Sequence, residues 1–330
     1  MQPFTSSILA RLAKEMGYSV ILESNFTQAG RIEFKSGKSC FFKLATLDCN
    51  GSAAAKIATD KDYASNFMKS LGFNVPVGKA FFSDEWCVAN NTCNNKKAAI
   101  AYAHELGYPV IIKPNSKAQG NGVNKIYNET ELTTTLEDLF LIDNIVLIQK
   151  IVPGRDYRFI VYADSNPIVY ERVPFSVIGN DKDTIFELAD NRIKGIRLSG
   201  RHIAIEPTDP RIKKRVSEVY NIQLSTIPKS GEKLQLLDNA NMSCGGESID
   251  LSNHVHESWR RLAINVSRKM NLKLCGIDIM TEGDLRKELS SYTVIEINDH
   301  PGLEHYSSMG EVQLERVENL YRKVIRDLDA

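Results

Sequence analysis

Residues 108–123 read YPVIIKPNSKAQGNGV. The apolar run at the beginning of this stretch predicts a buried strand, which stops at Pro114. Lys113 lies at the end of the strand, beside a loop that contains Gly120 and Gly122. An ammonium and bare backbone N–H groups in such a loop can surround phosphate oxygens, because glycines permit close approach to the backbone. The stretch therefore favours a phosphate-binding loop, and a surface hairpin with a solvated lysine is the alternative.

Two further apolar runs, at residues 274–280 and 292–297, predict strands that carry oxygen ligands. Asp278 lies inside the first run, where an unpaired carboxylate is costly. Glu296 and Asn298 alternate with isoleucines on the second strand, so both point to one face. Three such oxygens suit Mg²⁺, which binds carboxylates together with phosphate oxygens. The alternative is a carboxylate that forms a salt bridge with an arginine.

Two more segments have the composition of a nucleotide or anion site. Residues 241–246 form a small polar loop with Gly245 and Gly246, which can close over an anion or be a simple turn. Residues 149–152 form a strand edge that can offer backbone groups to a purine. Asp156 can accept hydrogen bonds from ribose hydroxyls, as acidic residues do in dinucleotide-binding folds. For these last residues an ordinary strand and turn is the alternative.

The overall composition is that of an ordinary globular protein. The 330 residues include 41 Lys plus Arg and 41 Asp plus Glu, so the formal net charge is zero, and 42% are apolar. This chain is too apolar to be disordered, and it lacks the basic excess of a general nucleic-acid-binding protein. The six scattered cysteines form no CxxC pair, so we expect free buried thiols rather than a zinc site. No signal segment and no membrane-length apolar run is visible, which predicts a cytoplasmic protein without a membrane partner.

The order of elements is mixed, which favours an α+β or mixed α/β architecture over a sandwich or a bundle. Helices are expected over residues 6–16, 60–71, 95–106, 130–140, 183–191, 209–219, 252–270 and 311–328. Strands are expected over residues 20–22, 31–34, 40–44, 109–113, 123–126, 145–148, 157–162, 168–173, 234–237, 274–280 and 292–297. Ser252 is the expected N-cap of its helix. A domain boundary is expected near Pro153 and Gly154.

In their order and approximate spacing, these segments resemble the ATP-grasp superfamily from about Ser52 to the end of the chain. The matching pieces are Asp60 with Lys61, residues 72–76, residues 108–114, the glycine-rich loop, residues 153–158, residues 276–278 and residues 296–298. Within the superfamily, the sequence looks most like the ligase domain of bifunctional glutathione synthetases and like cyanophycin synthetase. The most specific match to that branch is the pattern Asn241-x-Ser243-x-Gly245-Gly246-x-x-Ile249-Asp250.

The resemblance implies an α+β ATP-grasp fold, in which two α+β subdomains clamp ATP beside a short N-terminal α/β unit. We expect the N-terminal unit, on the substrate side, to cover residues 1–55. The central subdomain with its glycine-rich lid loop would cover residues 56–152. The C-terminal subdomain, with the magnesium and substrate sites, would cover residues 153–330.

The resemblance also implies an ATP site. Lys61 and Lys113 would hold the phosphates from two sides, and the backbone of Lys150 and Val152 would contact adenine. Gln149 stands where the family usually has a Glu that accepts from the adenine amino group, so the choice between ATP and GTP stays open. The expected ATP-binding residues are Lys61, Lys113, Ser116, Gln119, Gly120, Gly122, Gln149, Lys150, Val152 and Asp156.

The resemblance further implies a metal and catalytic centre. Asp278, Glu296 and Asn298 would bind two Mg²⁺ ions, with Mn²⁺ as a substitute. Arg158 would face the transferred phosphate or the substrate carboxylate. The remaining catalytic residues, Asn241, Gly245 and Gly246, would close over an acyl phosphate, and Arg201 and His305 are expected to contact substrate.

The activity that follows is that of an ATP-dependent carboxylate–amine ligase. Phosphoryl transfer from ATP would convert an acid to an acyl phosphate, and an amine would then displace phosphate to form an amide. The expected partners are a small acid or peptide and an amino acid, with no nucleic acid and with a homodimer as the assembly seen among relatives. Three alternatives remain open: glutathione synthetase proper, an ATP-grasp small-molecule kinase, and a non-catalytic ATP-binding regulator.

Overall fold

The computed structural model describes residues 3–117, 120–201 and 203–330, and the chain divides into two compact units. Unit 1 consists of Met1–Val169 and Leu251–Ala330, and unit 2 consists of Tyr170–Asp250. Unit 2 is therefore an insertion in the sequence of unit 1. The three-part division expected from the sequence, at residues 1–55, 56–152 and 153–330, stays a prediction.

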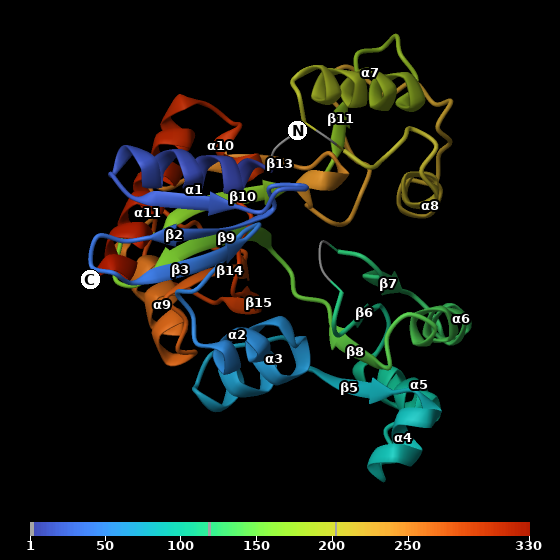
Figure 1. Cartoon of the computed structure of the whole chain (residues 1–330). Helices are drawn as coiled ribbons and strands as arrows, with labels where there is room; N and C mark the ends of the chain where they lie inside the picture. The colour runs from blue at the N-terminus through green and yellow to red at the C-terminus, as the bar shows by residue number, and fades with distance from the viewer. Residues whose placement is uncertain (1–2, 118–119, 202) are drawn as a thin grey trace. The chain divides into compact units, whose positions relative to one another are not determined.

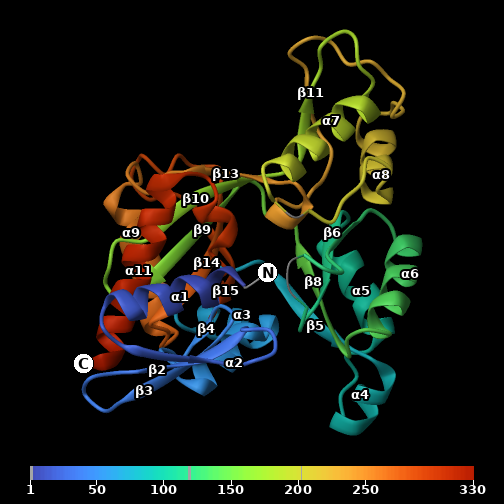
Figure 2. The ribbon, with the colours of Figure 1, turned by 45° about the horizontal axis from the view of Figure 1, so that its top comes forward.

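The N-terminal part of unit 1 is a helix on a small antiparallel sheet. The sheet has the order β1-β2-β3-β4, and its strands are Ser19–Leu22, Ala29–Glu33, Ser39–Lys43 and Thr46–Leu47. Helix α1 (Phe4–Glu15) buries Ile8, Leu9 and Leu12, as its apolar spacing predicts. It packs on β1 and β2 and against the C-terminal helix α11 (Glu311–Asp329), so the first and last helices of the chain lie side by side (Figure 2).

The central part of unit 1 is a second antiparallel sheet, of order β5-β8-β6-β7. Its strands are β5 (Gly78–Phe82), β8 (Ile145–Lys150), β6 (Val110–Pro114) and β7 (Asn124–Ile126). Its helices are α4 (Asp84–Asn90), α5 (Lys96–Leu106) and α6 (Glu129–Phe140). Helices α5 and α6 pack on the sheet and on each other (Figure 1). They bury aliphatic side chains such as Ile112, Leu136 and Ile148. This core fixes the strand that carries Lys113.

The C-terminal part of unit 1 contains the strands that carry the predicted carboxylates. Strand β14 (Leu274–Thr281) lies between β9 (Arg155–Tyr162) and β15 (Thr293–Asn298), antiparallel to both. Helices α2 (Ser52–Thr59), α3 (Lys61–Ser70) and α9 (Glu257–Lys269) contribute to one core with these strands, around Trp259, Met68 and Ile277. The short helix α10 (Glu304–Ser307) follows β15 and precedes α11.

Unit 2 has its own core. Strand β10 (Ile168–Val173) begins in unit 1 and continues into unit 2, where it pairs with β13 (Glu247–Asp250). The other elements are the antiparallel pair β11 (Ser176–Ile178) and β12 (Lys233–Gln235), the helices α7 (Ile185–Leu198) and α8 (Pro210–Val219), and the 3₁₀ turn η1 (Met242–Cys244). Phe175, Ile193 and Leu236 are fully buried among them.

Most of the predicted elements are confirmed, and one cap is wrong. The helix expected from Ser252 begins at Glu257, because the His256 side chain caps it and accepts from the Ser258 N–H. The Ser252 hydroxyl instead accepts from the Val169 N–H at 3.0 Å. The sequence reading also missed the short elements α2, α4, α10, β4, β5, β11 and β13.

All six cysteines are free, as expected, although Cys93 is exposed and Cys49 is half-buried. None of the helices in the described part of the chain combines the length and apolar composition that a membrane crossing needs.

Candidate functional site

Three charged side chains form a row across β9, β14 and β15. Arg158 pairs with Asp278 in the strand register, and Asp278 pairs with Glu296, so all three lie on one face of the sheet. Arg158 donates to both Asp278 oxygens, from Nε to Oδ1 and from Nη2 to Oδ2, each at 2.6 Å. Its Nη2 is also 3.7 Å from Glu296 Oε1. The arginine pair considered as the alternative for Asp278 is therefore present, and it adjoins the second carboxylate.

Asn298 completes the set of oxygen donors on β15. It lies two residues beyond Glu296, opposite Gly276, and its Nδ2 donates to Glu296 Oε1 at 3.3 Å. The pairing of β14 with β15 shifts register directly after Asp278. Such irregularities re-aim side chains next to functional sites. The structure thus brings together the three residues that the sequence assigns to metal binding.

These residues fit Mg²⁺. Two carboxylates and an amide oxygen are the hard donors that this ion prefers, and it usually keeps further positions for water and phosphate. Within the described residues, no group of three or more His, Cys, Asp and Glu side chains is arranged for a metal. The Asp278 side chain is only 3% exposed, whereas Glu296 is 29% exposed and so is open to a ligand.

Lys113 is a buried cation near the carboxylates. It is 5% exposed at the end of β6, and its ammonium forms no hydrogen bond or ion pair with any described residue. Burial lowers the pKa of this ammonium, while the negative charges of Glu296 and Asp278 partly oppose the effect. A buried unpaired charge is costly, and a bound anion removes that cost. The geometry therefore suits a phosphate ligand at Lys113.

Lys61 has a different environment, because its ammonium binds the loop that follows β6. Its Nζ donates to the Asn115 carbonyl oxygen at 3.0 Å and also to the Lys117 carbonyl oxygen. Burial lowers the pKa of Lys61, and nearby carboxylates, Glu296 first among them, raise it. The charge of Lys61 also lowers the pKa of Lys113, so the two lysines lie near each other. Both predicted phosphate-binding lysines thus belong to one electrostatic cluster with the carboxylates.

Asn115 is a site residue that the sequence reading missed. Its side chain is 3% exposed and joins the end of β6 to the beginning of α3. Nδ2 donates to Asp60 Oδ2 at 2.7 Å, and Oδ1 accepts from the Asp62 N–H at 2.9 Å. Asp60 is itself the N-cap of α3. These two hydrogen bonds of Asn115 form a clamp, which fixes Lys61, the first residue of this helix, relative to the glycine-rich loop.

The glycine-rich loop is anchored at its first residues. Ser116 donates from its N–H and its hydroxyl to Asp143 Oδ2, at 2.7 and 2.8 Å. Gly120 and Gly122 have positive φ, 73° and 76°. A Cβ at Gly122 would lie 2.9 Å from the Pro114 ring, so the close turn requires glycine there. The predicted phosphate-binding residue Gln119 lies outside the described residues.

The residues predicted to bind the base and ribose lie at the end of β8 and on β9. Gln149 is buried, and the Lys150 N–H donates to the Val77 carbonyl oxygen at 2.8 Å. The N–H of Lys150 is therefore not available to a base. Val152 is half-buried just beyond the strand, and Asp156 lies on β9 opposite Met280. These roles stay predictions.

The predicted catalytic loop in unit 2 is tightly turned. The Asn241 carbonyl oxygen accepts from the N–H groups of Cys244 and Gly246, at 2.9 and 3.1 Å. Gly245 has φ 77°, and a Cβ there would lie 2.8 Å from the Phe175 ring. A Cβ at Gly246 would lie 2.6 Å from the Ala240 carbonyl oxygen. Both glycines are therefore required by the turn itself, whether or not an anion binds there.

The two residues predicted to contact substrate lie in different units. Arg201 donates from Nη2 to the carbonyl oxygens of Met242 and Gly246, at 2.9 and 2.8 Å, and so holds both ends of the catalytic loop. His305 is half-buried on α10 in unit 1. Unit 1 thus carries the lysines, the carboxylates and His305, and unit 2 carries Arg201 and the glycine loop.

Buried lysines beside a glycine-rich loop, with carboxylates on neighbouring strands, are the arrangement that the sequence predicts for an ATP-grasp site. Two family models match the sequence: the D-ala D-ala ligase C-terminus over residues 67–191, and the RimK-like ATP-grasp domain over residues 224–318. The chain belongs to the ATP-grasp superfamily, as its sequence predicts, and has the α+β ATP-grasp fold. The ligases of this superfamily form carbon–nitrogen bonds.

Individual relatives point in the same direction. The glutathione biosynthesis bifunctional protein GshAB of Pasteurella multocida (strain Pm70) is 30% identical over 259 residues, which cover 74% of this chain and 32% of that protein. The protein of the same name from Clostridium perfringens (strain 13 / Type A) is 27% identical over 270 residues, which cover 80% of this chain and 33% of that protein. The chain thus spans about a third of the length of these relatives.

One solved structure supports the fold. The crystal structure of a bifunctional glutathione synthetase from Pasteurella multocida has a TM-score of 0.59 and 22% identity, and the match covers 98% of this chain and 44% of that chain. At this identity the likeness establishes the fold alone.

Proposed function

We propose that this chain is an ATP-dependent carboxylate–amine ligase. It would join a small acid or peptide to an amino acid through an acyl phosphate, with release of ADP and phosphate. The observation that carries the proposal is the row of Asp278 and Glu296 with Asn298, close to the buried, unpaired ammonium of Lys113. Oxygen donors next to a buried cation suit a metal-bound polyphosphate, and membership of the ATP-grasp superfamily makes ATP the expected one.

The residues of the row have separate tasks in this proposal. Asp278, Glu296 and Asn298 would hold Mg²⁺, which neutralises charge on the transferring phosphoryl group when it is bound. Lys113 would contact a phosphate, since its ammonium has no internal partner among the described residues. Arg158 orients Asp278 through two hydrogen bonds.

Lys61 and Asn115 would position the loop over the phosphates. Lys61 binds the loop carbonyls, and Asn115 fixes the distance from the loop to α3. In unit 2, Asn241 and the two glycines would close over the acyl phosphate. The amine needs mainly a fixed position for attack, so no additional catalytic triad is required.

The glutathione branch supplies the first specific version to test. The names of the curated relatives refer to glutathione biosynthesis, so γ-glutamylcysteine and glycine form the first substrate pair. Because the chain spans about a third of those relatives, the pair is tested within a panel of amino acids, acids and short peptides. Phosphate release is measured with ATP and Mg²⁺, and the products are weighed by mass spectrometry. A product mass equal to both substrates minus water identifies the ligase and its substrates.

The site assignment has its own test, with Asp278→Asn as the variant. It should lower the rate of phosphate release by about 100-fold or more, because one charge of the metal-binding set is lost. The matched control is Asp164→Asn, which also removes a carboxylate paired with an arginine, but one that is 75% exposed. Nearly wild-type turnover in Asp278→Asn would reject the assignment. A stable phosphorylated product formed without an amine would indicate the kinase, and ATP binding without turnover would indicate the regulator.

A further inference from the structure

Two arginines lie beside the glycine loop of unit 2. Arg192 is on α7, and Arg201 follows that helix and holds the loop through the Met242 and Gly246 carbonyl oxygens. Arg192 Nη2 lies 2.6 Å from Glu247 Oε1, and Arg201 Nη2 donates to the carbonyl oxygen of the preceding residue, Gly246, at 2.8 Å. Burial lowers the pKa of Arg201, the nearby Glu247 carboxylate raises it, and the charge of Arg192 lowers it again. Two cations and one carboxylate therefore occupy a small volume next to the loop.

Arg201 lacks a counter-ion. Among the described residues it forms no ion pair, its Nη2 donates only to backbone carbonyls, and its Nε is buried without a hydrogen-bond acceptor. Partly buried charges are normally paired with an opposite charge. A ligand that supplies the missing anion would remove the unfavourable free energy of this unpaired charge.

Arg192 occupies a position where packing alone would favour an aliphatic side chain. It lies on the face of α7 that buries Ala189 and Ile193. Its guanidinium lies 5.5 Å from the centre of the Phe175 ring, and its Nη2 is 2.6 Å from Glu247 Oε1. The Glu247 side chain is 55% exposed, so another carboxylate can replace it on Arg192.

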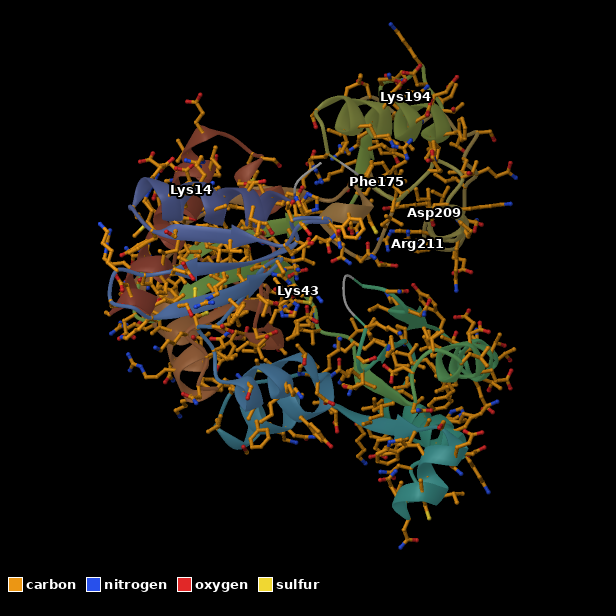
Figure 3. All side chains as sticks on the ribbon, viewed as in Figure 1. Lys14, Lys43, Phe175, Lys194, Asp209 and Arg211 are labelled. Carbon is orange, nitrogen blue, oxygen red and sulfur yellow. The ribbon has the colours of Figure 1, made fainter. Side chains whose placement is uncertain are left out.

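Neighbouring arginines of unit 2 show the ordinary arrangement. Arg211 forms two hydrogen bonds with Asp209, from Nε at 3.0 Å and from Nη2 at 2.8 Å, and this pairing raises the pKa of Arg211 (Figure 3). Arg197, also on α7, is paired with Glu206 at 2.6 Å. Each of these guanidinium groups has its own carboxylate, which Arg201 does not.

We propose that Arg192 and Arg201 form a carboxylate-binding subsite, which selects acid substrates that carry a second carboxylate in addition to the one that is activated. The inference rests on the proposed ligase function, since it assigns unit 2 to the acid substrate. A guanidinium binds a carboxylate through two parallel hydrogen bonds, so it selects a planar, correctly oriented group as well as a negative charge. The subsite adjoins the loop of Asn241, Gly245 and Gly246, which places recognition of the acid beside the loop assigned to its activated form.

Equilibrium binding of glutarate to the full chain tests the subsite without turnover. Glutarate is a small dicarboxylate, and its neutral diamide is the matched probe without charge. We expect the wild type to bind glutarate and to discriminate against the diamide. Arg192→Met and Arg201→Met should each weaken glutarate binding by about 10-fold or more, which corresponds to about 1.4 kcal/mol. ATP binding, measured on the same samples, should not change.

Further variants keep the result interpretable. Arg197→Met, an arginine of the same helix with its own carboxylate, is the control and should bind glutarate like the wild type. Arg201→Met also removes two bonds to the loop, so Glu247→Gln serves as the variant that leaves the loop intact. It should tighten glutarate binding, because it removes the carboxylate that competes for Arg192.

The outcomes separate this inference from the proposed function. Equal glutarate affinity in the wild type and both arginine variants would overturn the subsite. So would a wild type that binds no glutarate up to about 20 mM, or one that does not prefer it over the diamide. Asp278→Asn should keep glutarate binding. If it kept full turnover as well, the site assigned to the ligase would be rejected and the carboxylate subsite would still stand.

Discussion

The pairing of Arg158 with Asp278 allows a quantitative prediction for the variant Arg158→Met. The change removes two short hydrogen bonds to a carboxylate that is 3% exposed, so water cannot replace them. At about 1.5 kcal/mol for each charge-assisted bond, the loss is about 3 kcal/mol. Leaving a buried carboxylate without its partner places the total at about 3–5 kcal/mol. We expect the free energy of unfolding to fall by this amount.

Urea denaturation of the full chain measures this loss, with and without Mg²⁺. A cation at Asp278 and Glu296 supplies the charge that the missing guanidinium supplied. Mg²⁺ should therefore raise the unfolding midpoint of Arg158→Met by more than that of the wild type. The double variant Arg158→Met with Asp278→Asn should be more stable than Arg158→Met alone, since it no longer buries an unpaired charge.

Three results would refute this reasoning. A stability of Arg158→Met within about 0.5 kcal/mol of the wild type would show that the pair is solvated or readily replaced. Additive effects in the double variant would show that the two side chains do not interact. Equal stabilisation of both proteins by Mg²⁺ would show that the ion and Arg158 do not share the Asp278 carboxylate.

Three other predictions follow from buried groups of the site. Lys113→Met should weaken ATP binding about 10- to 100-fold in equilibrium titration, yet stabilise the free protein. Burial lowers the pKa of Lys113, so the unfolded chain binds this proton more tightly. In the wild type, stability therefore rises with pH from the lowered pKa to the ordinary lysine pKa of about 10.5, and this rise disappears in the variant. Asn115→Ala should lower the free energy of unfolding by about 1–3 kcal/mol, because Asp60 loses a buried donor; Asn124→Ala, at an exposed amide, should change it little. Gly245→Ala should cost about 2–4 kcal/mol from positive φ and contact with Phe175, whereas Gly37→Ala, at φ 84° with open space around it, should cost about 1 kcal/mol.

Each of these predictions has a result that contradicts it. Unchanged ATP affinity in Lys113→Met would remove the lysine from the phosphate site. Equal stability changes for the two asparagine variants would show that the clamp does not hold the fold. Equal costs for the two glycine variants would show that backbone strain alone matters and that the contact with Phe175 does not.

The sequence predicts those helices and strands that are marked by their own residues, such as a cap, a terminal glycine or an apolar stripe. The helix Lys96–Leu106 follows an asparagine cap and ends at Gly107, and the long helix Glu311–Asp329 has a continuous apolar stripe. Both were placed within one residue of their observed ends. The helices Ser52–Thr59 and Asp84–Asn90 were missed, because eight and seven residues are too few to show a helical period. Ser52–Thr59 contributes Ala58 to the core of unit 1, whereas Asp84–Asn90 is stabilised by its caps, the Ser83 side chain and the left-handed Asn91.

The candidate site also has features that the sequence predicts and features that only the structure shows. Alternation along one strand places Glu296 and Asn298 on a common face, and an acid inside an apolar run identifies Asp278. Register between strands cannot be read from alternation, so the pairing of Arg158 with Asp278 emerges only in the structure. The Asn115 clamp is even harder to predict from the sequence, because a single side-chain amide joins positions that are 53 and 55 residues apart.

These two contacts have a common consequence for how the site works. In the free protein, the positive charges of the site are held internally: Arg158 by Asp278, and Lys61 by the carbonyl oxygens of the loop. Only Lys113 has no internal partner among the described residues, so it is the cation that we expect a phosphate to meet first. With a metal ion held at Asp278, Arg158 would be bound less tightly there, and its guanidinium could face the transferred phosphate, the role that the resemblance to the ATP-grasp superfamily implies for it. The salt bridge and the predicted catalytic role of Arg158 are therefore compatible, because they belong to the free and the loaded states of one site.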